Sequence, residues 1–122
     1  MIKGLGSDLI EIARIKRLID KEGQKFLDRI FTEGEQAYCL QHSAAERHFA
    51  ARFAAKEAVA KALGTGIRGV VGWKDIEVVN DDAGKPVVEL SISVQMEFSA
   101  PSIHLSLTHS KEHAFAVAIW ES

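Results

Sequence analysis

The alternation of apolar and polar residues along the chain predicts a strand and a helix in close succession at its start. Residues 2–12 are largely apolar and compatible with a β-strand, although Gly4 and Gly6 interrupt them. Over residues 12–22 the apolar positions recur at helical spacing, and Gly23 follows as a residue that commonly ends a helix. We therefore expect a first strand that leads directly into a helix.

Two pairs of polar residues predict the beginnings of the next helices. Thr32 and Glu35 have the spacing of a capping box, in which each side chain bonds the backbone N–H of the other residue. They predict a helix that continues to about residue 42. Ser43 and Glu46 have the same spacing and predict the first turn of a longer helix.

The longer helix contains the segment RFAAKEAVAKALGTG at residues 52–66. Alanine, the strongest helix former, predominates in this segment and favours a helix. Gly64 and Gly66 predict the end of the helix, because glycine readily adopts the left-handed conformation found just beyond helix C-termini.

The second half of the chain changes to short apolar segments separated by turn residues. We expect strands in four of these segments, at residues 73–80, 86–94, 103–109 and 114–120. The third alternates Ile and Leu with polar residues, as in a strand with one buried face. Residues 93–100 fit either the end of a strand or a short helix. The order of elements predicts an α+β fold in which a mostly antiparallel sheet packs on one long helix, with shorter helices near the N-terminus.

Length and composition indicate a single domain that spans residues 1–122. Hydrophobic residues make up 47% of the chain and charged residues 26%, which is ordinary for a globular protein. The formal net charge of -2 gives no reason to expect a nucleic-acid partner. Cys39 is the only cysteine, which excludes an internal disulfide and a cysteine-based zinc site within one chain. We find no segment typical of a signal peptide or a membrane span, so we expect a cytoplasmic protein without a membrane partner.

Within the long helix, an acid and a base lie close to the apolar stripe. Phe49, Phe53, Glu57 and Lys61 follow one another four residues apart, so they lie along one slowly drifting ridge of the helix. In one interpretation, Glu57 and Lys61 form an ordinary exposed ion pair worth about 0.2–0.5 kcal/mol. In the other, Glu57 is a metal ligand beside a cation, and the surrounding alanines leave room for a bulky substrate.

Asp8 is a second candidate for metal binding. It follows Gly6 near the end of the first predicted strand, where an Asp commonly caps the next helix. Paired with Glu57, it would supply the two hard carboxylates with which proteins usually hold Mg²⁺ against substrate phosphates. The residue pattern alone does not decide between these roles.

Two polar surfaces also have both a plain and a functional interpretation. His104, Ser106 and Thr108 share one face of a predicted strand, which is either solvated or lines a nucleotide or phosphate site. Basic residues crowd into the first predicted helix, which is either a solvated charged face or a docking surface for an acidic partner. The chain has no Walker loop, GxGxxG, GxSxG or HExxH motif, so the corresponding nucleotide, hydrolase and zinc sites are not expected.

Five stretches of the chain occur together in a specific order. They are GSDLIEI with Asp8, FTEGE at 31–35, RFAAKEAVAKALGTG with Glu57 and Lys61, DIEVVNDDAGKP at 75–86 and HLSLTHSKEHAFAVAI at 104–119. Together they resemble the holo-acyl-carrier-protein synthase family, the small phosphopantetheinyl transferases, over almost the whole chain. Two features depart from the family pattern: Ser7 replaces a residue that is usually apolar, and residues 91–100 lack the expected small-residue helical pattern.

The resemblance implies a reaction that serves fatty acid biosynthesis. A member of this family transfers 4′-phosphopantetheine from coenzyme A to a serine of apo-acyl carrier protein and releases adenosine 3′,5′-bisphosphate. In family terms, Asp8 and Glu57 hold Mg²⁺ against the coenzyme A pyrophosphate, while Lys61 reaches the phosphates and protonates the leaving group. Either a metal-bound water or Asp8 would deprotonate the serine.

The resemblance also implies two binding surfaces and an assembly. The residues expected to bind the coenzyme are Lys61, Gly64, Lys85, Pro86, His104, Ser106 and Thr108. The residues expected to bind the carrier protein are Arg14, Arg17, Lys21 and Arg52, although Arg52 fits either surface. The family is typically a homotrimer with sites shared between neighbouring subunits, so the strand face with His104 and the Asp8–Glu57 pair would come from different chains.

Two other functions stay open at this point. A non-catalytic module that binds a carrier protein or a nucleotide would keep the fold and the basic helix but would need no metal pair. A metal-dependent phosphohydrolase acting on nucleotides would form product without any carrier protein. The co-occurrence of Asp8, Glu57 and Lys61 favours the transferase.

Overall fold

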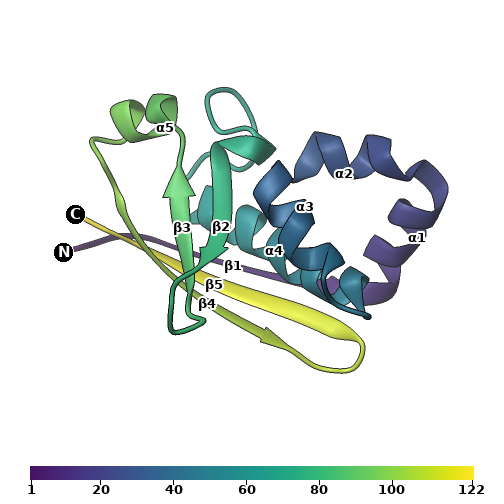
Figure 1. The fold of residues 1–122 in the computed structure, drawn as a ribbon. Helices are drawn as coiled ribbons and strands as arrows, with labels where there is room; N and C mark the ends of the chain where they lie inside the picture. Colours follow the sequence, from purple (N-terminus) through teal and green to yellow (C-terminus); the bar gives the residue numbers. More distant parts are fainter.

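The long helix α4 (Ala45–Ala62) lies across one face of an antiparallel sheet at the centre of the fold (Figure 1). The computed structural model describes residues 1–122. The sheet has three strands in the order β1 (Ile2–Glu11), β5 (His113–Glu121) and β4 (Ser102–His109). The predicted α+β architecture, with an antiparallel sheet packed on one long helix, is confirmed. None of the helices has the length and apolar character that crossing a membrane requires.

A two-stranded hairpin, β2 (Ile76–Asn80) and β3 (Pro86–Leu90), stands beside this sheet (Figure 1). The prediction of a strand over residues 73–80 is wrong at its start, because Trp73–Asp75 forms the 3₁₀ turn η1. The Asp75 carboxylate closes this turn by accepting a hydrogen bond from the backbone. The strand therefore begins only after the turn.

The second strand of the hairpin ends earlier than predicted. Residues 86–94 do not continue as a strand, because the short helix α5 (Ile92–Glu97) begins directly after β3. The hydroxyl of Ser91 caps this helix by accepting a hydrogen bond from the N–H of Val94 at 3.4 Å. Of the two interpretations of residues 93–100, the short helix is the correct one.

Three short helices connect β1 with α4: α1 (Ile12–Glu22), α2 (Gln24–Ile30) and α3 (Glu33–Leu40). The prediction of α1 is confirmed, and Gly23 ends it with a backbone φ of 59°. The Thr32–Glu35 capping box is also confirmed, since the N–H of Glu35 donates to Thr32 Oγ1 and the N–H of Thr32 donates to Glu35 Oε1. The sequence did not predict α2, and α3 ends slightly before residue 42.

The prediction of a second capping box, at Ser43 and Glu46, is wrong. The N-cap of α4 is Ala44, which makes no side-chain cap hydrogen bond, so Ser43 lies one residue before the position it was expected to occupy. The imidazole of His42 stacks on that of His48, with ring centres 3.9 Å apart. This stack, rather than a serine cap, joins the preceding turn to the first turn of the helix.

Two glycines of β1 allow the strand to lie directly on α4. A methyl group at Gly4 would collide with the carbonyl oxygen of Ala62, and one at Gly6 would collide with the carbonyl oxygen of Ala58. Glycine is the residue that permits such a close backbone approach. This contact brings the next inward-facing residue of the strand, Asp8, to the last turns of α4.

Candidate active site

The three residues expected to carry the chemistry meet where β1 crosses α4. The Nζ of Lys61 lies 3.1 Å from Asp8 Oδ1 and donates a hydrogen bond to the backbone carbonyl of Ser7 at 2.9 Å. Glu57 lies one turn earlier on α4, within reach of the charges of Asp8 and Lys61. Lys61 therefore pairs across to the strand, rather than forming the simple exposed pair with Glu57 along the helix.

The charges around Glu57 favour a bound cation. Burial raises the pKa of Glu57, and the negative charge of Asp8 raises it further, whereas Lys61 and Arg14 lower it. A raised pKa means that the ionised carboxylate is disfavoured in this environment. A cation beside Glu57 and Asp8 would offset both the lost hydration and the mutual repulsion.

The two carboxylates fit Mg²⁺ better than a structural metal. No group of three or more His, Cys, Asp or Glu side chains is gathered to hold a metal ion. Mg²⁺ usually keeps several waters and binds through one or two carboxylates together with substrate phosphates. Structural zinc, by contrast, takes four protein ligands. The side chain of Asp8 is 18% exposed and that of Lys61 is 49% exposed, so a phosphate can approach from solvent.

The residues predicted to form a polar face on β4 do so. Leu105 is buried, while His104, Ser106 and Thr108 are exposed on the opposite side of the strand. His104 Nε2 lies 2.8 Å from Glu121 Oε1, and this hydrogen bond lowers the pKa of Glu121. Two small hydroxyls and an imidazole paired with Glu121 thus lie on a surface that faces away from α4.

This polar face lies on the other side of the sheet from Asp8. In the strand register Asp8 pairs with Ala116, and Ala116 pairs with Leu107. Ala116 is fully buried, so this row faces α4. The rows with His104, Ser106 and Thr108 lie between and point the other way. Within one chain, therefore, the structure does not bring the polar face and the carboxylate pair together.

The other predicted coenzyme residues lie at two chain turns. Gly64 follows the end of α4 with a φ of 86°, and its N–H donates to the carbonyl of Lys61. Lys85 and Pro86 lie at the tip of the β2–β3 hairpin, where the Lys85 N–H donates to Asp81 Oδ1 at 2.8 Å. The first turn therefore adjoins the carboxylate site, whereas the second belongs to the hairpin.

Three of the residues predicted to bind a carrier protein are exposed on α1. Arg14, Arg17 and Lys21 recur at helical spacing, and all are accessible to solvent. Arg14 is close enough to Glu57 to lower the pKa of that carboxyl. The basic surface of α1 therefore adjoins the carboxylate site.

Arg52 is different, because its side chain is buried. The residue is 3% exposed, its Nη2 donates to Asn80 Oδ1 at 2.7 Å, and its guanidinium lies over the ring of Tyr38. This burial does not fit the prediction that Arg52 contacts a carrier protein. The expectation came from the family resemblance, which does not show that Tyr38 and Asn80 enclose this side chain.

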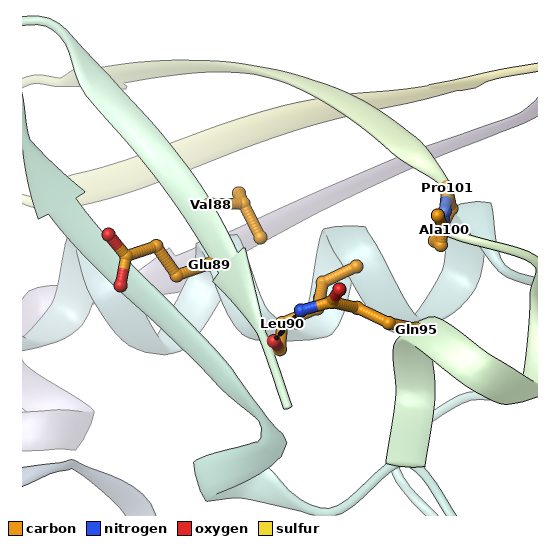
Figure 2. A pocket seen from close by; sticks show the side chains of 6 residues that line it. All are labelled: Val88, Glu89, Leu90, Gln95, Ala100 and Pro101. Atoms are coloured by element: carbon orange, nitrogen blue, oxygen red, sulfur yellow. Dashed lines mark hydrogen bonds between the residues drawn. The ribbon is translucent and has the colours of Figure 1, made fainter. Parts of the chain in front are cut away.

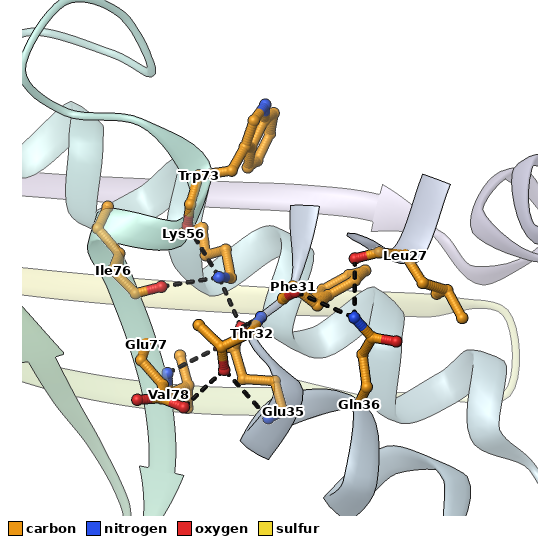
Figure 3. Close-up of polar contacts among 10 residues, drawn as sticks. All are labelled: Leu27, Phe31, Thr32, Glu35, Gln36, Lys56, Trp73, Ile76, Glu77 and Val78. Atoms are coloured by element: carbon orange, nitrogen blue, oxygen red, sulfur yellow. Dashed lines mark hydrogen bonds and ion pairs between the residues drawn. The ribbon is translucent and has the colours of Figure 1, made fainter. Parts of the chain in front are cut away.

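Sequence reasoning missed a buried ion pair between α3 and α4. Lys56 Nζ lies 2.6 Å from Glu35 Oε1, and both side chains have 0% exposure. Figure 3 shows that Lys56 also donates to the carbonyls of Trp73 and Ile76, while Glu35 Oε2 accepts from the N–H of Val78. The charged residue inside an alanine-rich helix was a signal for this pair, but its partner is distant in sequence.

A hollow of about 380 Å³ lies elsewhere, between β3 and α5. Figure 2 shows its lining, which comprises Val88, Glu89, Leu90, Gln95, Ala100 and Pro101. The Gln95 amide donates to the Leu90 carbonyl at 2.7 Å. The lining contains no cation and none of the predicted site residues, so it does not suit a pyrophosphate.

Comparison with protein families identifies the chain. Residues 4–119 match the model of the 4'-phosphopantetheinyl transferase superfamily. The chain belongs to this superfamily. Its relatives include the holo-[acyl-carrier-protein] synthase of Protochlamydia amoebophila, 48% identical over 122 residues and 100% of both chains. The synthase of Chlamydia felis is 50% identical over 115 residues, covering 94% of this chain and 93% of the relative.

Solved structures from the superfamily share the fold. The holo-[acyl-carrier-protein] synthase of Neisseria meningitidis superposes with a TM-score of 0.93, with 37% identity and 100% of both chains covered. The synthase of Bacillus anthracis, solved in complex with CoA (3',5'-ADP), has a TM-score of 0.86 and 44% identity, covering 100% of this chain and 98% of that one. The Helicobacter pylori synthase in complex with coenzyme A has a TM-score of 0.88 and 30% identity, covering 96% and 99%.

Proposed function

We propose that the protein is a magnesium-dependent enzyme that transfers 4′-phosphopantetheine from coenzyme A to a serine of apo-acyl carrier protein. Adenosine 3′,5′-bisphosphate leaves, and the product serves fatty acid biosynthesis. Superfamily membership and the synthases to which the chain is similar support the reaction. The observation that carries the proposal is the meeting of Asp8 and Glu57 beside Lys61. Phosphoryl transfer depends mainly on positioning and on charge stabilisation, which these groups supply.

Each of the three residues has a role that its surroundings support. Asp8 and Glu57 would hold Mg²⁺, which when bound neutralises charge on the pyrophosphate and polarises the attacked phosphorus. The ammonium of Lys61 has three N–H donors, of which the carbonyl of Ser7 and the carboxylate of Asp8 take two. The third donor is free for a phosphate oxygen, so Lys61 can hold the leaving bisphosphate and give it a proton.

We further propose a homotrimer that covers the outer face of the sheet. Leu5 is 66% exposed, Leu9 is 63% exposed and Phe115 is 37% exposed on that face. Contiguous exposed apolar side chains commonly mark a surface for another protein. Because His104 and its neighbours on this face point away from Asp8 of their own chain, they would serve the carboxylate pair of an adjacent subunit.

The basic surface of α1 is proposed to dock the acidic carrier protein. We expect Arg14→Glu to raise the KM for carrier protein and to weaken its salt dependence, because exposed charges mainly steer association. Lys74→Glu is the matched control, since Lys74 is exposed on η1. A loss of coenzyme A affinity in Arg14→Glu, with carrier binding unchanged, would place Arg14 on the wrong surface.

The deciding experiment is the intact mass of apo-acyl carrier protein after incubation with this protein, coenzyme A and Mg²⁺. We expect a gain of one phosphopantetheine that is lost when EDTA is added. Glu57→Gln should abolish the gain while the fold persists, and Glu97→Gln, which changes an exposed carboxylate on α5, should leave it intact. No gain with a carrier that a known synthase modifies would refute the proposed activity.

A further inference from the structure

The β2–β3 hairpin has one edge that the rest of the fold covers. On β2, the N–H of Val78 donates to Glu35 Oε2 at 2.8 Å, and the carbonyl of Ile76 accepts from Lys56 Nζ at 2.7 Å. A buried carboxylate and a buried ammonium thus satisfy the outward-facing backbone groups of this strand. Covering a strand edge prevents other chains from pairing with it.

The hydrogen-bond pattern of the hairpin shows which backbone groups of β3 face outward. Ser91, just past the end of β3, donates its N–H to the carbonyl of Asp75 at 2.9 Å, so these two residues form a hydrogen-bonded pair. Hydrogen-bonded and non-hydrogen-bonded pairs alternate along an antiparallel ladder. Counting along β3 from Ser91, Glu89 therefore bonds to β2, whereas Val88 and Leu90 turn their N–H and C=O groups outward.

Three of these outward groups have no hydrogen-bond partner within the protein: the N–H and carbonyl of Val88 and the N–H of Leu90. Only the carbonyl of Leu90 is satisfied, by the Gln95 amide at 2.7 Å. No strand pairs with this edge, because β3 and β4 belong to separate sheets. The edge borders the hollow of about 380 Å³, with Ala100 and Pro101 on the far side (Figure 2). Unpaired backbone groups on a strand form a template for an added strand.

The open edge of β3 also carries an unpaired negative charge. Glu77 and Glu89 lie directly opposite each other in the strand register. Glu77 Oε2 accepts a hydrogen bond from the hydroxyl of Thr32 at 2.6 Å, whereas Glu89 is exposed and forms no ion pair. Like charges directly opposite each other destabilise a sheet, so a cation beside Glu89 would be favourable.

Exposed apolar side chains continue this surface onto α5. Ile92 is 75% exposed and Met96 is 77% exposed, and they lie one turn apart on the same side of the helix. Both belong to residues 91–100, whose sequence departs from the family pattern. Neighbouring exposed apolar side chains commonly mark a contact with another protein.

We propose that the open edge of β3 binds an extended segment of a partner protein in which basic and apolar residues alternate. The segment would add as a strand and bond the free groups of Val88 and Leu90, as in β-augmentation. Because strand side chains alternate between two faces, its basic residues would lie beside Glu89 and its apolar residues on the side of Val88.

Two considerations separate this site from the other surfaces of the protein. A second copy of the chain is a poorer occupant, because pairing β3 with itself would bring two Glu89 carboxylates together. The open edge shares no residue with the carboxylate site formed by Asp8 and Glu57. The inference therefore does not depend on the proposed function.

Amide hydrogen exchange of the full chain, followed by NMR, tests the proposal with the peptide acetyl-Lys-Val-Lys-Val-Lys-Val-amide. In free protein the N–H groups of Val88 and Leu90 should exchange rapidly, whereas those of Val87 and Glu89 should be protected by β2. Saturating peptide should slow exchange at Val88 and Leu90 by about fivefold or more, as for one added hydrogen bond.

Two controls separate strand addition from simple charge attraction. The same peptide with N-methylated valines keeps its charge but lacks the donors that would face Val88, so it should bind at least about fivefold more weakly. Glu89→Lys should raise the Kd of the unmodified peptide about tenfold, because an attraction becomes a repulsion. Glu112→Lys, on the exposed β4–β5 turn, changes the net charge equally and should alter the Kd less than about twofold.

Three results would overturn the proposal. Equal affinity for the N-methylated peptide would reduce the binding to charge attraction alone. An unchanged Kd in Glu89→Lys, or unchanged exchange at Val88 and Leu90, would place the peptide elsewhere. Protection of these two N–H groups in free protein would show that the edge is already covered, and protection that grows with protein concentration would assign it to a second copy.

Discussion

Replacing Lys56 with methionine tests how strongly the fold depends on its buried ion pair. Methionine has nearly the length of lysine but carries neither charge nor N–H donors. Lys56 Nζ contacts Glu35 Oε1 and the carbonyls of Trp73 and Ile76, with no exposure of either charged side chain. Lys56→Met would therefore leave Glu35 buried without its cation and two carbonyls without their donor.

The expected loss follows from this geometry. Removing one partner of a buried ion pair destabilises a protein by about 3–5 kcal/mol, because the remaining charge stays out of water. A domain of this size has a total stability of about 5–15 kcal/mol, so the loss would be a large share. Burial is the main influence on Lys56 and lowers its pKa, while Glu35 raises it. Desolvation thus outweighs attraction, and neutralising both partners should be better tolerated than removing one.

Urea unfolding at pH 7 measures the effect, with two companion variants as controls. Glu35→Gln combined with Lys56→Met should recover about 2 kcal/mol, since it removes the unpaired charge. Lys61→Met makes the same replacement at a side chain that is 49% exposed, and should change stability by less than about 1 kcal/mol while abolishing transfer. A Lys56→Met protein within about 1 kcal/mol of wild type would refute the reasoning.

Three further variants test the site and its surroundings. Gly6→Ala should lower the free energy of unfolding by about 3 kcal/mol, because its methyl group would collide with the Ala58 carbonyl; an unchanged urea midpoint would contradict this. In metal-free protein above pH 4.5, Glu57→Gln should raise the melting temperature, because burial and Asp8 raise the pKa of Glu57 and its ionisation therefore opposes folding. The same variant should lose the stabilisation that Mg²⁺ gives to wild-type protein, and a melting temperature below that of wild type in metal-free buffer would count against this reasoning. Wild-type protein should lose stability as the pH falls below 6.5, because burial lowers the pKa of His48 and the unfolded chain therefore takes up the proton first. His48→Phe should flatten this dependence of stability on pH, and an unaltered slope would exclude His48 as its cause.

Local patterns predicted those elements whose signals lie within a few residues. The Thr32–Glu35 box forms because both of its hydrogen bonds are made within one turn. The alternation at residues 103–109 predicted which side of β4 is buried, since the side chains of a strand alternate between two faces. Gly64 ends α4 through its own backbone conformation.

The remaining features depend on partners that are distant in the sequence. Ser43 had the right spacing for a cap, yet the stacking of His42 on His48 accompanies a different turn. Resemblance to a family placed Arg52 on a binding surface, but Tyr38 and Asn80 enclose it. Such contacts are set by tertiary packing, which spacing along one helix does not encode.

The adjacent residues Lys56 and Glu57 show how one helix can serve both the core and the site. Consecutive side chains of an α-helix point about 100° apart. Lys56 and Arg52, four residues apart on one ridge, both bond the β2–β3 hairpin, whereas Glu57 and Lys61 on the neighbouring ridge meet Asp8 of β1. A shift or rotation of α4 would therefore move the carboxylate site and the hairpin together. This arrangement explains why two charged side chains are buried on the side of the helix that does no chemistry: they fix α4 against the hairpin, so that Glu57 and Lys61 on the neighbouring ridge are held beside Asp8.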